Sequence, residues 1–109
     1  MDVGFDSKKL RDVCESKEML ENVYGRDSSG SLMSFFADLQ AASSLNELRS
    51  IYRIDPNHSH NGGFKVFLTQ SCEVSLCGIA SKEMLQLGAE SGWDHVRRVK
   101  ILRIEVNHA

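Results

Sequence analysis

The spacing of apolar residues changes once along this chain, from a helical period to an alternating one. Over residues 7–42 apolar side chains recur every three to four positions, which is typical of amphipathic helices. From Ile51 onward apolar and polar residues alternate, which is the pattern of strands with one buried face. Because the helical pattern comes first and the strand pattern second, the sequence predicts an α+β fold.

The first helices are marked by residues that favour helix ends. Residues 2–5 predict a short opening strand, after which Asp6 or Ser7 caps a first helix. Ser16 begins a second helix, and Gly25 ends it. The opening of the chain is therefore expected to fold as a strand followed by two short helices.

The next segment predicts one longer helix. The polar stretch 26–31, "RDSSGS", indicates a loop or kink, and the apolar stripe that follows it predicts a helix to about Ala42. Phe35 and Phe36 belong to this stripe and are assigned to packing. Residues 43–48 predict a short capped turn that leads into the sheet.

The alternating half predicts an antiparallel meander and a last strand. The meander consists of residues 51–56, 64–69 and 72–79, with a tight turn at Gln70-Ser71. Residues 80–95 interrupt the sheet with a helical turn and a glycine-tryptophan corner. Residues 96–106 are rich in β-branched side chains and predict a final, central strand. The expected architecture is two or three N-terminal helices on a twisted, mainly antiparallel sheet of four to five strands.

Length and charge narrow the class of protein. With 109 residues the chain is expected to form one domain, residues 1–109. It carries 13 Lys and Arg against 15 Asp and Glu, a formal charge of −2. A general polyanion binder is thereby disfavoured, and any contact with nucleic acid must use a local basic patch. The C-terminal half is the more basic one and is favoured as the binding face.

The cysteines and the apolar stretches indicate the compartment. Cys14, Cys72 and Cys77 form an odd set without metal-ligand spacing, and the N-terminus lacks the organisation of a signal peptide. The apolar stretches are far shorter than the roughly 18 residues that cross a bilayer. We therefore expect a soluble, cytoplasmic protein with no membrane contact, whose thiols are buried as small apolar groups.

The stretch "DPNHSHNGGFKVF", residues 55–67, contains the first candidate chemistry. His58 and His60 could begin a zinc site, but a site needs three or four ligands. Asp55, Cys72 and His108 are the other candidates, and none has diagnostic spacing, so we expect no metal. A purely polar hairpin is a second interpretation of the same residues.

An acid–base interpretation fits the residue types better. Cleavage of RNA without a metal needs a base for the 2'-hydroxyl proton, an acid for the leaving 5'-oxygen and a cation at phosphorus. His58, His60 and His108 are candidates for base and acid, and Arg53 and Lys65 are candidate cations.

Two further features are compatible with RNA contact. The stretch "VRRVK" brings Arg97, Arg98 and Lys100 together as a possible phosphate patch, or as a solvated strand edge. Trp93 could stack on a base or cover the core.

Several segments together resemble the plasmid-maintenance killer proteins of the RelE/HigB superfamily. These segments are "SKKLRDVCES", "NVYG", "FFADLQAASSLNELRSIYRID", "GFKVF" and "GWDHVRRVKILRIEVNH", in order and over nearly the whole chain. The resemblance implies a small α+β toxin fold, a cognate antitoxin as partner, and cleavage of mRNA in the ribosomal A site. The 2'-hydroxyl is the nucleophile in such toxins, so neither a metal nor a cofactor is implied.

The resemblance carries over to individual positions unevenly. Arg53 matches a basic position of the family, and His108 matches the histidine of its tyrosine-histidine ending, where Asn107 replaces the tyrosine. In the loop, Asn57 or His58 stands at the family's lysine, and His60 or Asn61 at its arginine. Cys72-Glu73 replaces an aromatic-arginine pair, and a glutamate there would repel phosphate.

These correspondences lead to one main hypothesis and two alternatives. The main hypothesis is a ribosome-dependent mRNA endonuclease with His60, His108 and Arg53 as catalytic residues. Its substrate-binding residues are then His58, Lys65, Arg97, Arg98 and Lys100. The first alternative is a diverged, non-catalytic module of the toxin fold that binds a protein partner. For an antitoxin-like partner in either case, an apolar groove beside residues 32–42 is the expected binding place. The second alternative is a ParE-like gyrase inhibitor. Whether the protein is an enzyme stays open at this stage.

Overall fold

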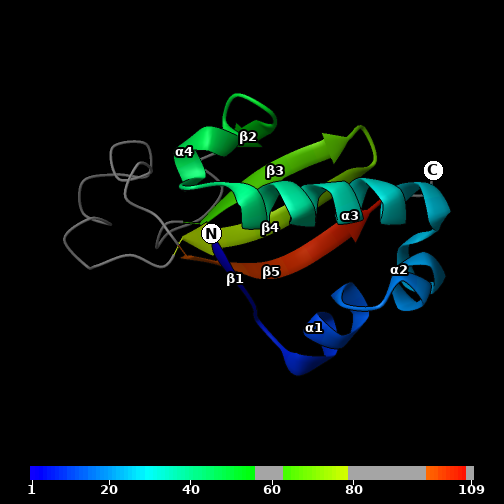
Figure 1. Ribbon diagram of the computed structural model, residues 1–109. Coiled ribbons are helices and arrows are strands. Elements are labelled where there is room, and N and C mark those ends of the chain that lie inside the picture. The colour runs from blue at the N-terminus through cyan, green and yellow to red at the C-terminus, as the bar shows by residue number, and fades with distance from the viewer. Residues whose placement is uncertain (56–62, 79–97, 108–109) are drawn as a thin grey trace.

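The computed structural model describes residues 1–55, 63–78 and 98–107, and these residues form an α+β fold. Four helices accompany a five-stranded mixed sheet in the described part of the chain (Figure 1). The predicted fold class is thereby confirmed. The elements in chain order are β1 (Asp2–Phe5), α1 (Lys8–Cys14), α2 (Lys17–Tyr24), α3 (Arg26–Ala41), α4 (Leu45–Leu48), β2 (Arg53–Asp55), β3 (Gly63–Thr69), β4 (Cys72–Gly78) and β5 (Arg98–Val106).

Serine caps begin the first two helices, as predicted. The side chain of Ser7 accepts a hydrogen bond from the amide of Leu10, and Ser16 does the same for Met19. Each serine thus satisfies an amide that has no partner inside the helix. The strand predicted at residues 2–5 is also present, as β1.

The prediction of a loop or kink over residues 26–31 is wrong, because α3 begins at Arg26 and continues through these residues. Gly25 has a φ of 91°, a conformation open to glycine, and it both ends α2 and precedes α3. The chain therefore turns within one residue. Ser29 and Leu32 are buried on the same helix, so packing overrides the weak helix propensity of serine and glycine.

The sheet has the strand order β1-β5-β4-β3-β2. Strands β2, β3 and β4 form the predicted antiparallel meander, and β5 pairs antiparallel with β4. On its other side β5 pairs in parallel with β1. The last strand is therefore an interior strand, as expected from its β-branched residues, although the middle of the sheet is β4.

Some predicted segments differ from the structure or lie outside it. Strand β2 begins at Arg53 rather than Ile51, because the backbone amides of Ile51 and Tyr52 donate to the carbonyl of Leu48 and extend the α4 turn. The turn at Gln70-Ser71 joins β3 and β4 as predicted. Residues 56–62 and 79–97 lie outside the described residues, so the predicted hairpin loop, the 80–95 turn and Trp93 have no structural account here.

The hydrophobic core lies between α3 and one face of the sheet (Figure 1). Phe35 is fully buried and Phe36 is partly buried against the core, so their assignment to packing is confirmed. The fully buried apolar side chains on the helices and on the sheet come from α2, α3, α4, β3, β4 and β5: Leu20, Leu32, Phe35, Leu39, Leu45, Leu48, Phe64, Val66, Val74, Leu76, Val99 and Ile101.

Two polar contacts attach peripheral segments to α3. The terminal ammonium of Met1 donates to the carbonyls of Gln40 and Ala42 at 2.8 Å each, which places a positive charge at the C-terminal end of the helix. The hydroxyl of Tyr52 donates to Asp38 Oδ2 at 2.5 Å, and its ring packs edge-on against Phe35. Burial and this hydrogen bond raise the pKa of Tyr52 to about 12.

The predicted burial of the thiols holds for two of the three cysteines. Cys14 and Cys72 are buried, and burial raises the pKa of Cys14 to about 12. Cys77 is partly exposed on the sheet, so the prediction is wrong for this residue, because β4 turns it away from the core.

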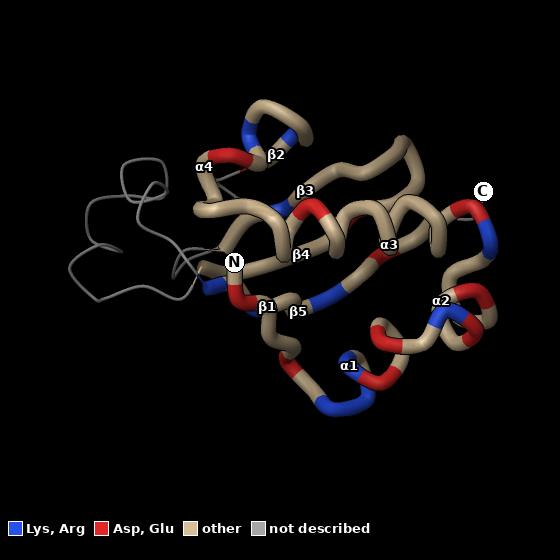
Figure 2. The backbone as a smooth tube through the Cα atoms, viewed as in Figure 1, with Lys and Arg blue, Asp and Glu red and all other residues tan. Residues whose placement is uncertain are grey.

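Charge is distributed in small opposite groups in the described chain. Figure 2 shows acidic and basic positions interspersed around α1 and α2. No helix in the described residues combines the length and the apolar character needed to cross a membrane.

Candidate functional site

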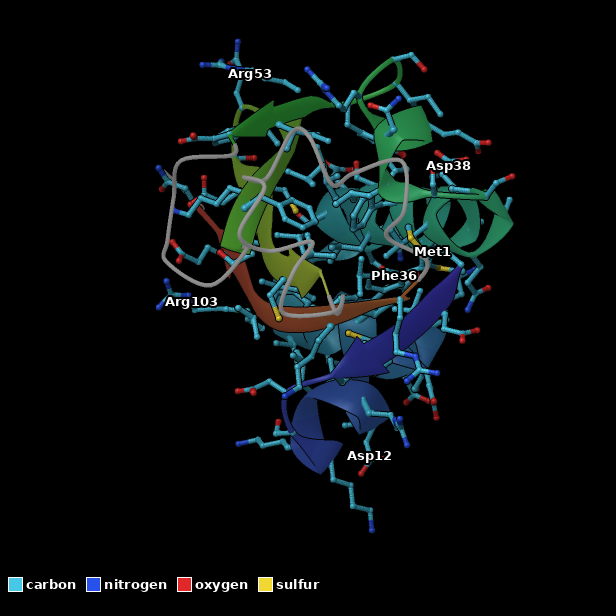
Figure 3. All side chains as sticks on the ribbon, turned by 90° about the vertical axis from the view of Figure 1, so that its left-hand side faces the viewer. Met1, Asp12, Phe36, Asp38, Arg53 and Arg103 are labelled. Carbon is cyan, nitrogen blue, oxygen red and sulfur yellow. The ribbon has the colours of Figure 1, made fainter. Side chains whose placement is uncertain are left out.

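The face of the sheet turned away from α3 carries most of the predicted site residues that the structure describes. Because residues opposite one another in a sheet point to the same side, the strand register assigns side chains to this face. Figure 3 shows Arg53 and Arg103 on the side of the sheet opposite to Asp38 of α3. We call it the open face; its side chains are Arg53, Asp55, Lys65, Phe67, Glu73, Ser75, Cys77, Lys100, Arg103 and Glu105.

One row across the open face combines a cation, an aromatic ring and two carboxylates. Arg53 lies opposite Phe67, Phe67 opposite Glu73, and Glu73 opposite Glu105. The guanidinium carbon of Arg53 is 5.1 Å from the centre of the Phe67 ring, a cation–π contact. This stacking holds the guanidinium over Phe67 and displaces it toward the strand that carries Glu73.

The neighbouring row supplies cations to the two carboxylates. Lys65 Nζ is 3.1 Å from Glu73 Oε1, and Arg103 Nε is 2.8 Å from Glu105 Oε1. Ser75 lies between Lys65 and Arg103 in the register, and its hydroxyl is buried without a hydrogen-bond partner. The cations of the second row therefore neutralise the two carboxylates of the first row.

A pocket of about 870 Å³ opens at the end of the first row. The β3–β4 turn forms one wall, and the end of β5 forms another, fixed by a 2.7 Å hydrogen bond from the Asn107 amide to the Ser71 carbonyl. The pocket combines one guanidinium, two carboxylates and several amide and hydroxyl groups. Its lining residues are Arg53, Phe67, Thr69, Gln70, Ser71, Cys72, Glu73, Glu105, Val106 and Asn107.

The opposite end of β5 carries two further ion pairs. Arg98 Nε is 3.8 Å from Asp2 Oδ2, and Lys100 Nζ is 3.7 Å from Asp6 Oδ1. Both pairs are exposed, so each contributes little to stability. They bind β5 to β1 and its following turn, at the edge of the sheet.

The structure brings some of the predicted residues together and separates others. Arg53 lines the pocket, and Lys65 is on the adjacent strand of the same face. Arg98 and Lys100 are five to seven residues along β5 from the pocket residue Glu105, which at about 3.3 Å per residue is roughly 16–23 Å. They form a separate group. His58, His60, Arg97 and His108 lie outside the described residues.

Sequence reasoning missed part of this pocket. Phe67 and Glu105 are not among the residues that the sequence predicts for the site. Alternation along β3 places Phe67 on the same side as Lys65, but an irregular pairing of β4 with β5 breaks the alternation along β5 before Glu105. The turn Thr69–Cys72, which the sequence predicts as a connection between two strands, also lines the pocket. The pairing of Lys65 with Glu73 depends on strand register, which the local pattern does not contain.

The pocket beside α3 differs from the apolar groove expected there. Its volume is about 440 Å³, and on α3 it is lined by residues between Asp27 and Ser34, so it overlaps residues 32–42 only at Ser34. Small and polar residues dominate its lining: Asp27, Gly30, Ser31, Ser34, Tyr52 and Leu68.

Metal ligands and thiols offer no alternative site in the described part. Within residues 1–55, 63–78 and 98–107, no three histidine, cysteine or carboxylate side chains come together in a group that could hold a metal ion. The pKa of Cys77 is raised, mainly by burial; Lys100 opposes this shift and Asp6 adds to it. A raised pKa keeps the thiol protonated, so Cys77 is not an activated nucleophile.

The arrangement can bind an oxyanion at Arg53 and accept a proton at a carboxylate in the same pocket. No protein-family model, no curated protein and no solved structure matches this chain.

Proposed function

We propose that this protein is the toxin of a type II toxin–antitoxin module and cleaves mRNA on the ribosome by 2'-hydroxyl attack, without a metal. The observation that carries the proposal is the placement of Arg53, stacked on Phe67, in a pocket that also contains carboxylates. A guanidinium held in this way can stabilise the charge that develops on a phosphodiester.

The rest of the support comes from the sequence and the fold class. The resemblance to RelE/HigB toxins runs over nearly the whole chain, and these toxins have a small α+β fold. Their sheet carries the side chains that act on RNA, and here the pocket lies at the sheet. The cognate antitoxin, the ribosome and mRNA are the proposed partners.

The direct test is ribosome-dependent cleavage by the full-length protein. The wild type is expected to slow growth when it is induced alone, and to cut mRNA on purified ribosomes but not free RNA. A 2'-deoxy substitution at the cut site should abolish cleavage, since the nucleophile is then absent. Absence of both growth inhibition and cleavage would contradict the proposal.

A second candidate function is favoured by the ion pairs of the described cations. Lys65, Arg98 and Lys100 each contact a carboxylate, which reduces their availability to phosphate. A non-catalytic module that binds a protein partner is compatible with such a neutralised surface. Stable co-purification with the product of an adjacent gene, without toxicity or cleavage, would support this function, whereas full toxicity would exclude it.

A further inference from the structure

The proposed cleavage needs a general base close to the phosphate-binding cation. Glutamate and aspartate side chains serve as general bases in enzymes. The pocket presents two such carboxylates, Glu73 and Glu105.

Glu73 is the nearer of the two carboxylates to Arg53 in the sheet. Along the row, Glu73 is two strands from Arg53 and Glu105 is three. At about 4.8 Å between strands, their backbones are roughly 10 and 14 Å from that of Arg53. The Arg53 guanidinium lies over Phe67, which is on β3, the strand between those of Arg53 and Glu73. A phosphodiester bound to this guanidinium would therefore lie beside Glu73.

The surroundings of Glu73 keep its position defined. Lys65 reaches from the neighbouring row to contact Oε1 at 3.1 Å, which leaves the second carboxylate oxygen to accept a further proton or hydrogen bond. Glu73 is also directly opposite Phe67, and such partners have Cβ atoms about 5 Å apart. A ribose stacked near this ring would therefore present its hydroxyl to the carboxylate.

We infer that Glu73 is the general base of this protein, acting on RNA bound at Arg53; the inference rests on the proposed function. Glu73 takes the proton of the 2'-hydroxyl, and the 2'-oxygen forms a bond to phosphorus. The bond from phosphorus to the 5'-oxygen breaks, and that oxygen takes a proton from water. The products are a 2',3'-cyclic phosphate and a 5'-hydroxyl, after which Glu73 returns its proton to the hydroxide.

This assignment reverses the role that the family comparison gives to position 73. A glutamate there repels phosphate if it is considered alone. With Arg53 on one side and Lys65 in contact, the carboxylate is placed beside the anion site rather than in it.

The experiment measures single-turnover cleavage of ribosome-bound mRNA by full-length variants. Glu73→Gln, which keeps the shape of the side chain, should cleave about 100-fold or more slowly while still binding the ribosome. Glu73→Ala should be equally slow, and added acetate should restore about tenfold or more of the rate, because a free carboxylate can occupy the vacated space. The same concentration of chloride should restore nothing.

Two controls separate a catalytic role from a structural one. Lys65→Met breaks the same ion pair but keeps the carboxylate, so acetate should not accelerate it. Glu15→Gln makes the same change as Glu73→Gln at an exposed carboxylate that follows α1, outside the pocket, and it should cleave at the wild-type rate.

Different outcomes overturn different statements. If the wild type cleaves but Glu73→Gln keeps nearly the full rate, or if acetate and chloride act alike on Glu73→Ala, the inference is wrong and the proposed function stands. If Glu105→Gln shows the large loss instead, the base is assigned to the wrong carboxylate. If the wild type itself does not cleave, the proposed function fails, and the inference fails with it.

Discussion

Lys65 Nζ lies 3.1 Å from Glu73 Oε1, and this ion pair joins β3 to β4 on the open face of the sheet. Only 16% of the lysine side chain and 26% of the glutamate side chain are exposed, so both charges are largely removed from water. Breaking a pair of this kind leaves one charge without a partner in a poorly solvated place. The ion pair therefore contributes to the stability of the fold and also fixes the position of Glu73 in the pocket.

The first prediction concerns this pair. Lys65→Met should lower the free energy of unfolding by about 2 kcal/mol, because the Glu73 carboxylate loses its partner while it remains mostly buried. The double variant Lys65→Met with Glu73→Leu should recover most of the loss, since no charge is left unpaired. Urea unfolding of the three proteins measures both effects. Losses below about 0.5 kcal/mol for the single variant would mean that water solvates the pair in solution.

The second prediction concerns the hydrogen bond from Tyr52 to Asp38. Tyr52→Phe should cost about 1.5 kcal/mol at neutral pH, the usual size of a hydrogen bond to a charged group. In the folded state the pKa of Tyr52 is raised from 10.0 to about 12, so the unfolded chain loses this proton first. The difference in free energy of unfolding between wild type and variant should therefore have its full size below pH 10 and decrease as the pH rises toward 12.

Urea unfolding of both proteins at a series of pH values tests this prediction. Other groups titrate in the same alkaline range, but they are common to both proteins and cancel in the difference. A difference between the two proteins that stayed constant up to pH 12 would contradict the raised pKa of Tyr52.

The third prediction uses two glycines near the start of α3. Gly25→Ala should destabilise the protein by about 1 kcal/mol or more, because a φ of 91° is unfavourable for alanine. Gly30→Ala should instead stabilise it by about 0.5–1 kcal/mol, since Gly30 is inside the helix and an added Cβ meets no atom within 4 Å. Thermal unfolding of the two variants provides the comparison. Destabilisation by both would mean that α3 does not begin at Arg26.

The fourth prediction concerns the thiols. Cys77 is partly exposed while Cys14 and Cys72 are buried, so a thiol reagent should modify one cysteine per folded chain faster than the other two. All three should react in urea. The variant Cys77→Ser should lose the fast phase of modification, while Cys14 and Cys72 still react in urea. A fast phase of two thiols in the folded wild type would be inconsistent with the packing of the core.

The sequence predicted the elements of this fold better than it predicted their contacts. The caps Ser7 and Ser16 act within three residues of themselves, so their roles could be inferred from neighbours alone. The helical state of residues 26–31 could not, because it depends on burial of Ser29 and Leu32 against distant parts of the chain. Local composition favoured a loop there, and tertiary packing decided otherwise.

In the candidate site, too, local sequence predicts the face of a side chain but not its contacts. Alternation in β3 places Lys65 on the polar side of the sheet, so the face on which this cation lies follows from the sequence. That Lys65 contacts Glu73 depends on register, which shifts between Phe67 and Thr69 where β3 meets β4. A single sequence does not show such a shift, so the pocket and its carboxylates became visible only in the structure.

The parallel pairing of β1 with β5 has a consequence for how this protein folds. Asp2 is opposite Arg98, so two strands that lie 96 positions apart in the chain must meet before the sheet is complete. Contacts of such large sequence separation slow folding, because the chain loses entropy before the pairing is gained. During synthesis, β1 and the four helices that follow it are made long before β5, the strand that pairs with β1. The pocket needs residues 105–107, so it is assembled only after β5 has been made.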